Sequence, residues 1–155
     1  MKLSKTFKNN VSSIIEEIIK DCENLEFKIE NSKGKSKVNG KSNSKYFLIY
    51  TYINKVYFVV FKIRISDHHK PKNYLNFFDD VDLDYTILDN IENDLILHLK
   101  KCLPEIIKFF NENNKNDVKG FQNYFNKFRM NFRKEFNKKI RSVFKKIKNR
   151  DLEVN

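Results

Sequence analysis

The sequence has neither alanine nor tryptophan, and it holds only three glycines, two prolines and two cysteines in 155 residues. Asparagine, lysine, isoleucine and phenylalanine are abundant instead. AT-rich codons produce this bias, so part of the lysine excess reflects composition and not function. A codon bias of this kind would spread the lysines evenly along the chain, whereas their distribution here is uneven.

Long hydrophobic runs are also lacking. The chain begins with polar residues and shows no apolar segment of the kind found in a signal peptide. The longest apolar stretch, Tyr46 to Phe61, is interrupted by Asn54-Lys55 and is too short to span a bilayer. Cys22 and Cys102 each extend an apolar helical stripe, which favours buried free thiols in a reducing compartment over a disulfide. These features predict a cytoplasmic protein that does not associate with membranes.

Acidic residues are scarce in one stretch, Lys119 to Arg150. It carries twelve of the 31 basic residues and a single acid, Glu135, so its formal charge of +11 equals that of the whole chain. The rest of the chain is neutral. A neutral body with a cationic helical segment is typical of proteins that bind a polyanion, most commonly nucleic acid. The charge pattern therefore predicts nucleic acid or a nucleoprotein complex as the partner.

The first 65 residues predict a helix followed by a small antiparallel sheet. Apolar residues recur at helical spacing from Val11 to Cys22. Apolar and polar residues then alternate over 25–29, which indicates a half-buried strand. Two further strands, Tyr46–Ile53 and Val56–Ile65, are joined tightly enough to form a hairpin. In the second, the pattern places Tyr57, Val59, Phe61, Ile63 and Ile65 on one face.

Between and after these strands we expect loops and two further helices. Residues 31–45 predict a mobile, solvated loop, and residues 66–89 an irregular, acidic segment. Asp89 with Glu92 predicts a capping box for a helix that Pro104 either kinks or divides. Asp117 can cap the last helix. The expected class is α+β: an N-terminal helix, a small antiparallel sheet of about three strands, and C-terminal helices.

The size and the 40% apolar share indicate one domain with a substantial core. We expect residues 1–155 to form that single domain. Residues 1–116 would be an α+β body, and residues 117–150 a long basic helix packed on it or projecting from it. The element order is similar to that of double-stranded-RNA-binding domains, but the long acidic loop and the extra basic helix depart from that family.

The last helix has two distinct faces. Phe121, Phe132 and Val143 repeat every eleven residues, as do Phe125, Phe136 and Ile147, and this period predicts a nearly straight packed stripe. Cations lie opposite that stripe over about 30 Å: Lys127, Lys134, Lys138, Arg141, Lys145 and Lys148. Such a basic row can neutralise successive phosphates without reading bases. The alternatives are a solvated face, or neutralisation by the acidic segment 79–94.

Two other groups of cations are candidates for the same partner. Lys35, Lys37 and Lys41 could contact a nucleic-acid backbone from a flexible loop, and Arg64 from the solvent-facing end of its strand. The loop is not a phosphate-binding Walker motif. Five residues separate its glycines where that motif has four, and a strand follows where a helix is needed.

Signals for catalysis or metal binding are weak. We expect that the protein is not an enzyme and has no catalytic residue, metal or cofactor. Asp67-His68-His69 with the distant His98 lacks the spacing of a metal site. Glu26-x-Lys28 resembles a restriction-type nuclease pattern, but the expected preceding strand with its aspartate is absent. The aromatic residues of the hairpin could stack bases, but core packing is the favoured interpretation.

One short segment carries a resemblance. Ser42-x-Ser44-x-Tyr46, a hairpin, and then Arg64-Ile65-Ser66-Asp67-His68 resembles a segment of small phage and mobile-element proteins, over roughly a sixth of the chain. The resemblance implies a phage-type accessory protein, a group that includes inhibitors of host defence such as anti-CRISPR proteins. The function we expect is a non-enzymatic binding protein. The alternatives are a metal-dependent nuclease and a helical oligomerisation module, and a homodimer could form through the helices.

Overall fold

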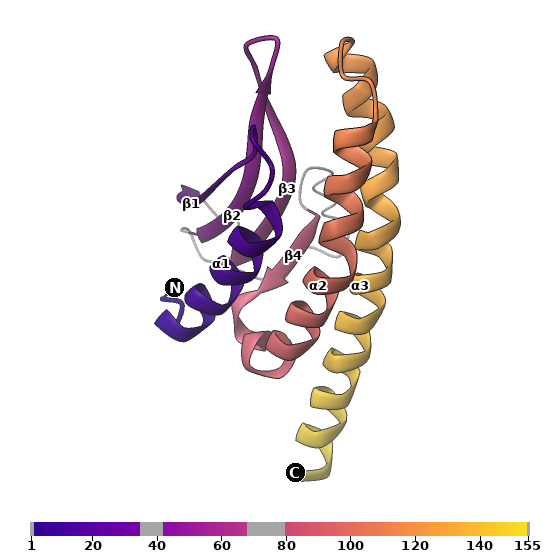
Figure 1. Ribbon diagram of the computed structural model, residues 1–155. Coiled ribbons are helices and arrows are strands. Elements are labelled where there is room, and N and C mark those ends of the chain that lie inside the picture. Colours follow the sequence, from indigo (N-terminus) through magenta and orange to yellow (C-terminus); the bar gives the residue numbers. More distant parts are fainter. Residues whose placement is uncertain (1, 35–41, 68–79, 155) are drawn as a thin grey trace.

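The computed structural model of the chain describes residues 2–34, 42–67 and 80–154 (Figure 1). Its elements are α1 (Lys5–Ile19), β1 (Glu26–Gly34), β2 (Ser42–Ile53), β3 (Val56–Ser66), β4 (Val81–Asp84), the 3-10 turn η1 (Tyr85–Ile87), α2 (Leu88–Glu112) and α3 (Val118–Val154). An N-terminal helix, a sheet and two C-terminal helices confirm the predicted α+β class.

The sheet differs from the expected three antiparallel strands. Its order is β1-β2-β3-β4, and β4 pairs parallel to β3, so the sheet is mixed and four-stranded. β4 lies in the segment predicted to be irregular. With only two buried apolar residues, Val81 and Leu83, it is too short for its alternation to be recognised against the surrounding aspartates.

The predicted loop 31–45 is also partly wrong. β1 continues to Gly34 and β2 begins at Ser42, and these two residues face each other in the antiparallel register. Residues 35–41 lie outside the described part. The flanks are polar, but main-chain hydrogen bonds form the ladder whatever the side chains are. Apolar alternation therefore underestimated the strand lengths.

The β2–β3 hairpin confirms the predicted turn and corrects the predicted faces. Asn54 and Lys55 have φ values of 50° and 66°, as a tight type I′ turn requires. β3 contains a bulge beyond this turn, because Ile49 faces Phe61 whereas the next residue of β2, Tyr50, faces Val59. The inserted residue, Val60, resets the alternation. Tyr57 and Val59 therefore do not share a face with Phe61, Ile63 and Ile65.

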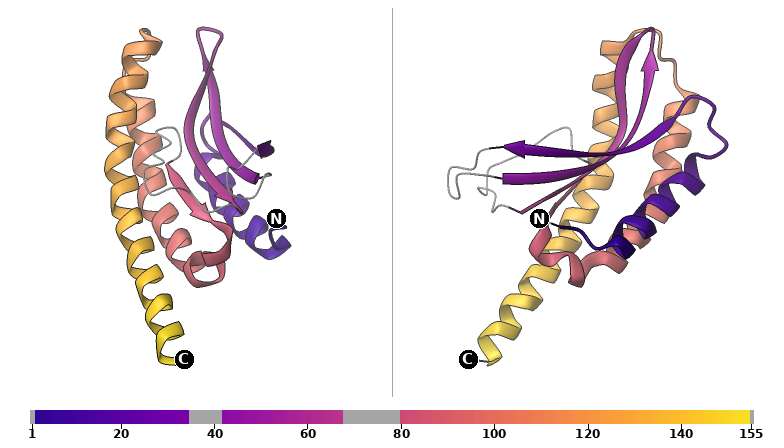
Figure 2. Two further views of the ribbon diagram at one scale, coloured as in Figure 1. Left: turned by 180° about the vertical axis from the view of Figure 1, so that it is seen from behind. Right: turned by 90° about the vertical axis from the view of Figure 1, so that its left-hand side faces the viewer.

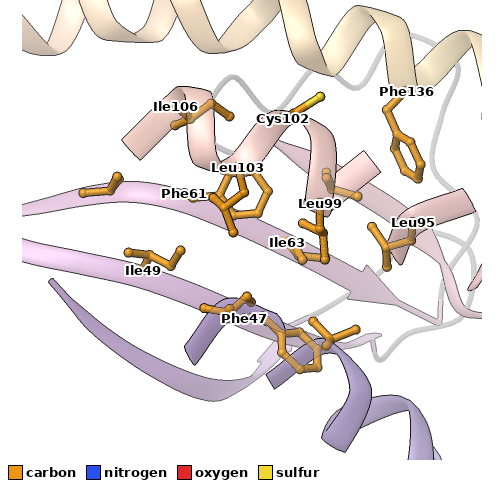
Figure 3. Packing of buried hydrophobic residues seen from close by; sticks show 14 of the residues in the cluster. Phe47, Ile49, Phe61, Ile63, Leu95, Leu99, Cys102, Leu103, Ile106 and Phe136 are labelled. Atoms are coloured by element: carbon orange, nitrogen blue, oxygen red, sulfur yellow. The ribbon is translucent and has the colours of Figure 1, made fainter. Parts of the chain in front are cut away.

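One face of the sheet carries the core. α1 and α2 lie side by side on this face, and α3 runs antiparallel to α2 on the side away from α1 (Figures 1 and 2). Phe47 of β2 meets Phe7 of α1 with ring centroids 6.2 Å apart, and Phe61 and Ile63 of β3 pack below Leu99 and Leu103 of α2 (Figure 3).

The helix ends follow the predictions in part. Gly120 donates its backbone N–H to Asp117 Oδ1 at 3.2 Å, so Asp117 caps α3 as expected. The capping box at Asp89 does not form, because α2 already begins at Leu88 and Asp89 lies in its first turn. α2 continues through Pro104 without dividing. Cys22 and Cys102 are free thiols, as predicted.

The C-terminal end of α3 projects beyond the N-terminal end of α2 (Figure 1). In the described part of the chain, no helix has the length and apolar character needed to cross a membrane.

Candidate nucleic-acid interface

The basic row of α3 is exposed as its spacing predicts. Lys127, Lys134, Lys138, Arg141 and Lys145 are all exposed. The side chain of Lys148 lies outside the described part. Phe125 and Phe136, on the opposite side of the helix, are 0% exposed. The row therefore faces away from the protein core.

An aromatic cluster holds α3 against the body. Phe121 and Phe125 pack against Phe58 of β3 with ring centroids 5.6 and 5.9 Å apart, and both also contact Phe110 of α2. Farther along, Phe136 stacks on His98 of α2 at 4.6 Å. These contacts fix which side of α3 turns inward, and so direct the basic row outward.

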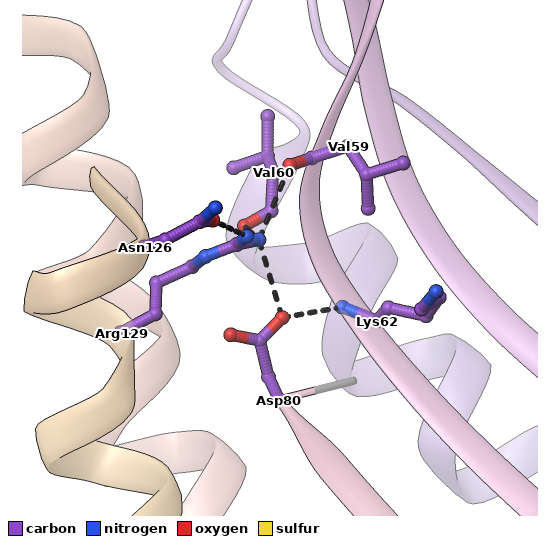
Figure 4. A network of polar contacts seen from close by, with 6 residues as sticks. All are labelled: Val59, Val60, Lys62, Asp80, Asn126 and Arg129. Atoms are coloured by element: carbon purple, nitrogen blue, oxygen red, sulfur yellow. Dashed lines mark hydrogen bonds and ion pairs between the residues drawn. The ribbon is translucent and has the colours of Figure 1, made fainter. Parts of the chain in front are cut away.

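Arg129 differs from the row because it points inward and is only 5% exposed (Figure 4). Its Nη1 donates to the carbonyl oxygens of Val59 and Val60 at 3.1 and 2.7 Å, and pairs with Asp80 Oδ2 at 3.3 Å. Its Nη2 donates to the side-chain oxygen of Asn126. Arg129 thus links α3 to the bulged part of β3, ahead of the point where β4 begins to pair.

Asp80 completes this link. Its Oδ2 accepts a hydrogen bond from the Lys62 backbone N–H at 2.9 Å, and its own N–H donates to the Lys62 carbonyl. The charge pattern alone includes Arg129 among the cations of α3 and assigns it no role. A signal was present, because Arg129 follows Phe125 by four residues and therefore falls within the apolar stripe.

Arg64 does not belong to the exposed surface. Its side chain is 6% exposed and forms two hydrogen bonds to Asp82, at 3.3 and 3.2 Å, across the parallel β3–β4 pair. Asp82 balances its charge within the fold. The prediction that this end of β3 reaches solvent is therefore wrong. The other predicted loop cations, Lys35, Lys37 and Lys41, lie outside the described residues.

The acidic segment has roles other than neutralising the row. Asp80 binds Arg129, Asp82 binds Arg64, and Asp84 accepts from the backbone N–H of Thr86. Within the described ranges, the exposed cations of the row form no ion pair with these aspartates. The row therefore presents its charge outward.

The candidates for catalysis that lie in the described ranges do not converge on a site. Glu26 accepts a hydrogen bond from the Tyr50 hydroxyl at 2.7 Å, and Lys28 pairs with Glu30 at 2.7 Å. Among the described residues, no three His, Cys, Asp or Glu side chains gather so that they could hold a metal ion. His68 and His69 lie outside those residues.

His98 is buried beside Cys102, with Nδ1 and Sγ 3.4 Å apart. Burial lowers the pKa of His98 to about 4 and raises the pKa of Cys102 to about 11. Both groups are therefore neutral near pH 7. The pair lacks the thiolate that a nucleophilic cysteine needs, and it serves in packing α2 against α3.

The hairpin aromatics divide between the two faces of the sheet. Phe47 and Phe58 are buried in the core, as the favoured interpretation predicted. Tyr52 and Tyr57 are exposed and contact each other and Tyr50, so core packing does not account for the tyrosines.

Comparison of the chain with family models, with curated proteins and with solved structures finds no match.

Proposed function

We propose that this protein binds nucleic acid without hydrolysing it, and that the basic row of α3 contacts the phosphate backbone. The observation that carries the proposal is the exposure of five cations on the side of α3 opposite its buried aromatic stripe. The backbone of a helix and its packing on α2 hold the Cα atoms of these cations in a fixed line, so little backbone freedom is lost on binding.

The chemistry of the row fits phosphates better than base edges. Lysine side chains are long and flexible and act as point charges, which suits a series of phosphates but not bidentate reading of a base. We expect salt-dependent binding with weak sequence preference. The resemblance to phage accessory proteins favours a defence nucleoprotein as the target, because its guide- or target-binding channel would offer the same phosphates.

The test is a titration of the protein with a labelled DNA duplex at several salt concentrations. If four or five cations each neutralise one phosphate, log Kd should change with log salt with a slope of about 4 in magnitude. Changing Lys134, Lys138 and Arg141 together to glutamate should abolish binding while the melting temperature holds, because all three side chains are exposed.

A matched control separates the row from net charge. Changing the exposed Lys5, Lys100 and Lys108 to glutamate alters the net charge equally but leaves α3 intact. This control should bind the duplex within a few-fold of wild type. Equal loss of duplex binding in both triple variants would show that binding depends on net charge and not on the position of the basic row. Unchanged duplex binding by the α3 variant, with loss of a protein partner from a pull-down, would assign the row to protein contact.

A further inference from the structure

The face of the β2–β3 hairpin that is turned away from α1 and α2 carries a tyrosine cluster formed by Tyr50, Tyr52 and Tyr57. The ring centroids lie 5.5 to 6.4 Å apart. Tyr52 and Tyr57 form a direct cross-strand pair, and their exposed fractions are 62% and 42%. Large aromatic side chains gathered at the surface are a common mark of a binding site.

The fold explains why this face is open. The neighbouring residues Thr51 and Phe58 are buried because they point to the face that α1 and α2 cover. The tyrosines alternate with them along the two strands and contact one another, so they point to the other face, away from α1 and α2. The cluster is thus not part of the core shared by the sheet and the helices.

Cations border the cluster. Lys28 Nζ lies 4.5 Å from the ring centroid of Tyr50 and 4.9 Å from that of Tyr57, and Lys55 is exposed in the adjacent turn. Lys28 also pairs with Glu30, so a phosphate would share the Lys28 ammonium with that carboxylate, and Glu26 accepts a hydrogen bond from the Tyr50 hydroxyl. Flat aromatic faces beside ammonium groups match a ligand that has both flat rings and negative charge.

We infer that the tyrosine cluster stacks the unpaired bases of a single-stranded nucleic acid, with Lys28 and Lys55 near its phosphates. The inference rests on the proposed function for the class of partner but concerns a different surface. A single strand is required because the bases of a duplex are already stacked on one another. A cationic peptide is a poorer match, since the chain itself carries a net charge of +11.

The experiment compares a short oligothymidine with a duplex of equal length, at a salt concentration high enough to suppress binding by charge alone. The variants are Tyr52→Ala/Tyr57→Ala and the control Tyr52→Phe/Tyr57→Phe, which keeps the rings. We expect the alanine pair to weaken single-strand binding by at least about tenfold. The phenylalanine pair should bind the single strand as wild type does, and duplex binding, measured at low salt, should be the same in wild type and both variants. Tyrosine fluorescence of the wild type should fall on binding the single strand.

Three results would overturn the inference: no single-strand binding by the wild type, equal binding by the alanine pair, or equal loss in both variants. If an arginine-rich peptide quenches the tyrosines and the oligothymidine does not, the surface belongs to a protein partner. The α3 proposal fails separately, because it is tested on duplex binding with the glutamate variant of the basic row, whose tyrosines are intact.

Discussion

The Nη1 of Arg129 on α3 donates a hydrogen bond of 2.7 Å to the carbonyl oxygen of Val60 on β3. Val60 is the bulge residue, and ahead of Lys62 the edge of β3 has no β4 partner in the register. Arg129 therefore supplies a donor to a strand edge that would otherwise leave buried carbonyl groups unpaired. Together with the aromatic contacts of Phe121, Phe125 and Phe136, this hydrogen bond sets the rotation of the helix that carries the basic row.

Replacing Arg129 with methionine should destabilise the protein by about 3 kcal/mol or more, because the buried Asp80 would lose its ion pair with Arg129. Equilibrium unfolding in urea measures the loss. The exposed Lys134→Met on the same helix is the control and should change stability by less than about 0.5 kcal/mol. Equal stabilities of the two variants would show that the aromatic cluster alone holds α3 in place.

Replacing Ile15 with aspartate tests the packing of α1. Ile15 is 0% exposed, so the carboxylate would be buried without a partner, at a cost of several kcal/mol. We expect loss of the cooperative thermal transition. Ser13→Asp places the same group at an exposed position of α1 and should leave the melting temperature nearly unchanged. A shift of less than about two degrees for Ile15→Asp would mean that this stripe is not a core surface.

The depressed pKa of His98 predicts a loss of stability in mild acid. Desolvation is the main cause, with Lys139 and Lys101 lowering the pKa and Glu135 raising it. Between the ordinary value of 6.5 and the folded value of about 4, the unfolded chain binds the proton more readily. The contribution of the neutral His98 to stability is fully present above pH 6.5 and is lost as the pH falls to about 4, amounting to roughly 3 kcal/mol.

Urea unfolding at a series of pH values measures this dependence, and His98→Leu should flatten the curve over that window. Asp67 does not confound the comparison. Hydrogen bonds from the backbone and side chain of Asn43 lower its pKa below 3.8, so its contribution is lost at lower pH. A wild-type stability that stays constant from pH 6.5 to 4 would contradict the burial of a neutral imidazole.

The non-enzymatic interpretation predicts that purified protein does not cleave DNA or RNA in the presence of Mg²⁺, Mn²⁺ or Zn²⁺. Lys28 is bound to Glu30 and lies over the tyrosine rings, so it is not placed to orient a water molecule for Glu26. Gel assays with labelled substrates measure cleavage. Hydrolysis that disappears in Glu26→Gln and persists in the exposed control Glu23→Gln would establish the nuclease alternative.

The sequence by itself determined the features that repeat along one element. Helical spacing from Val11 to Cys22 predicted the buried side of α1, and the eleven-residue repeat predicted the buried aromatic residues of α3. The turn at Asn54-Lys55 followed from two strand patterns with two residues between them. Each of these signals is local, because side-chain period and burial are linked within a single helix or strand.

Only the tertiary structure decided the roles of individual charged and aromatic residues. Arg129 and Asp80 are 49 residues apart in sequence, and Arg64 and Asp82 are 18 apart, so neither pairing can be read from periodicity. Strict alternation predicts that Tyr57 and Phe61 share one face of the strand. The bulge at Val60 places them on opposite faces. Burial of a charge depends on which partner the fold brings to it, whereas an exposed charge such as Lys134 needs none. The basic row could therefore be predicted from the sequence, whereas the buried ion pairs of Arg129 and Arg64 could not.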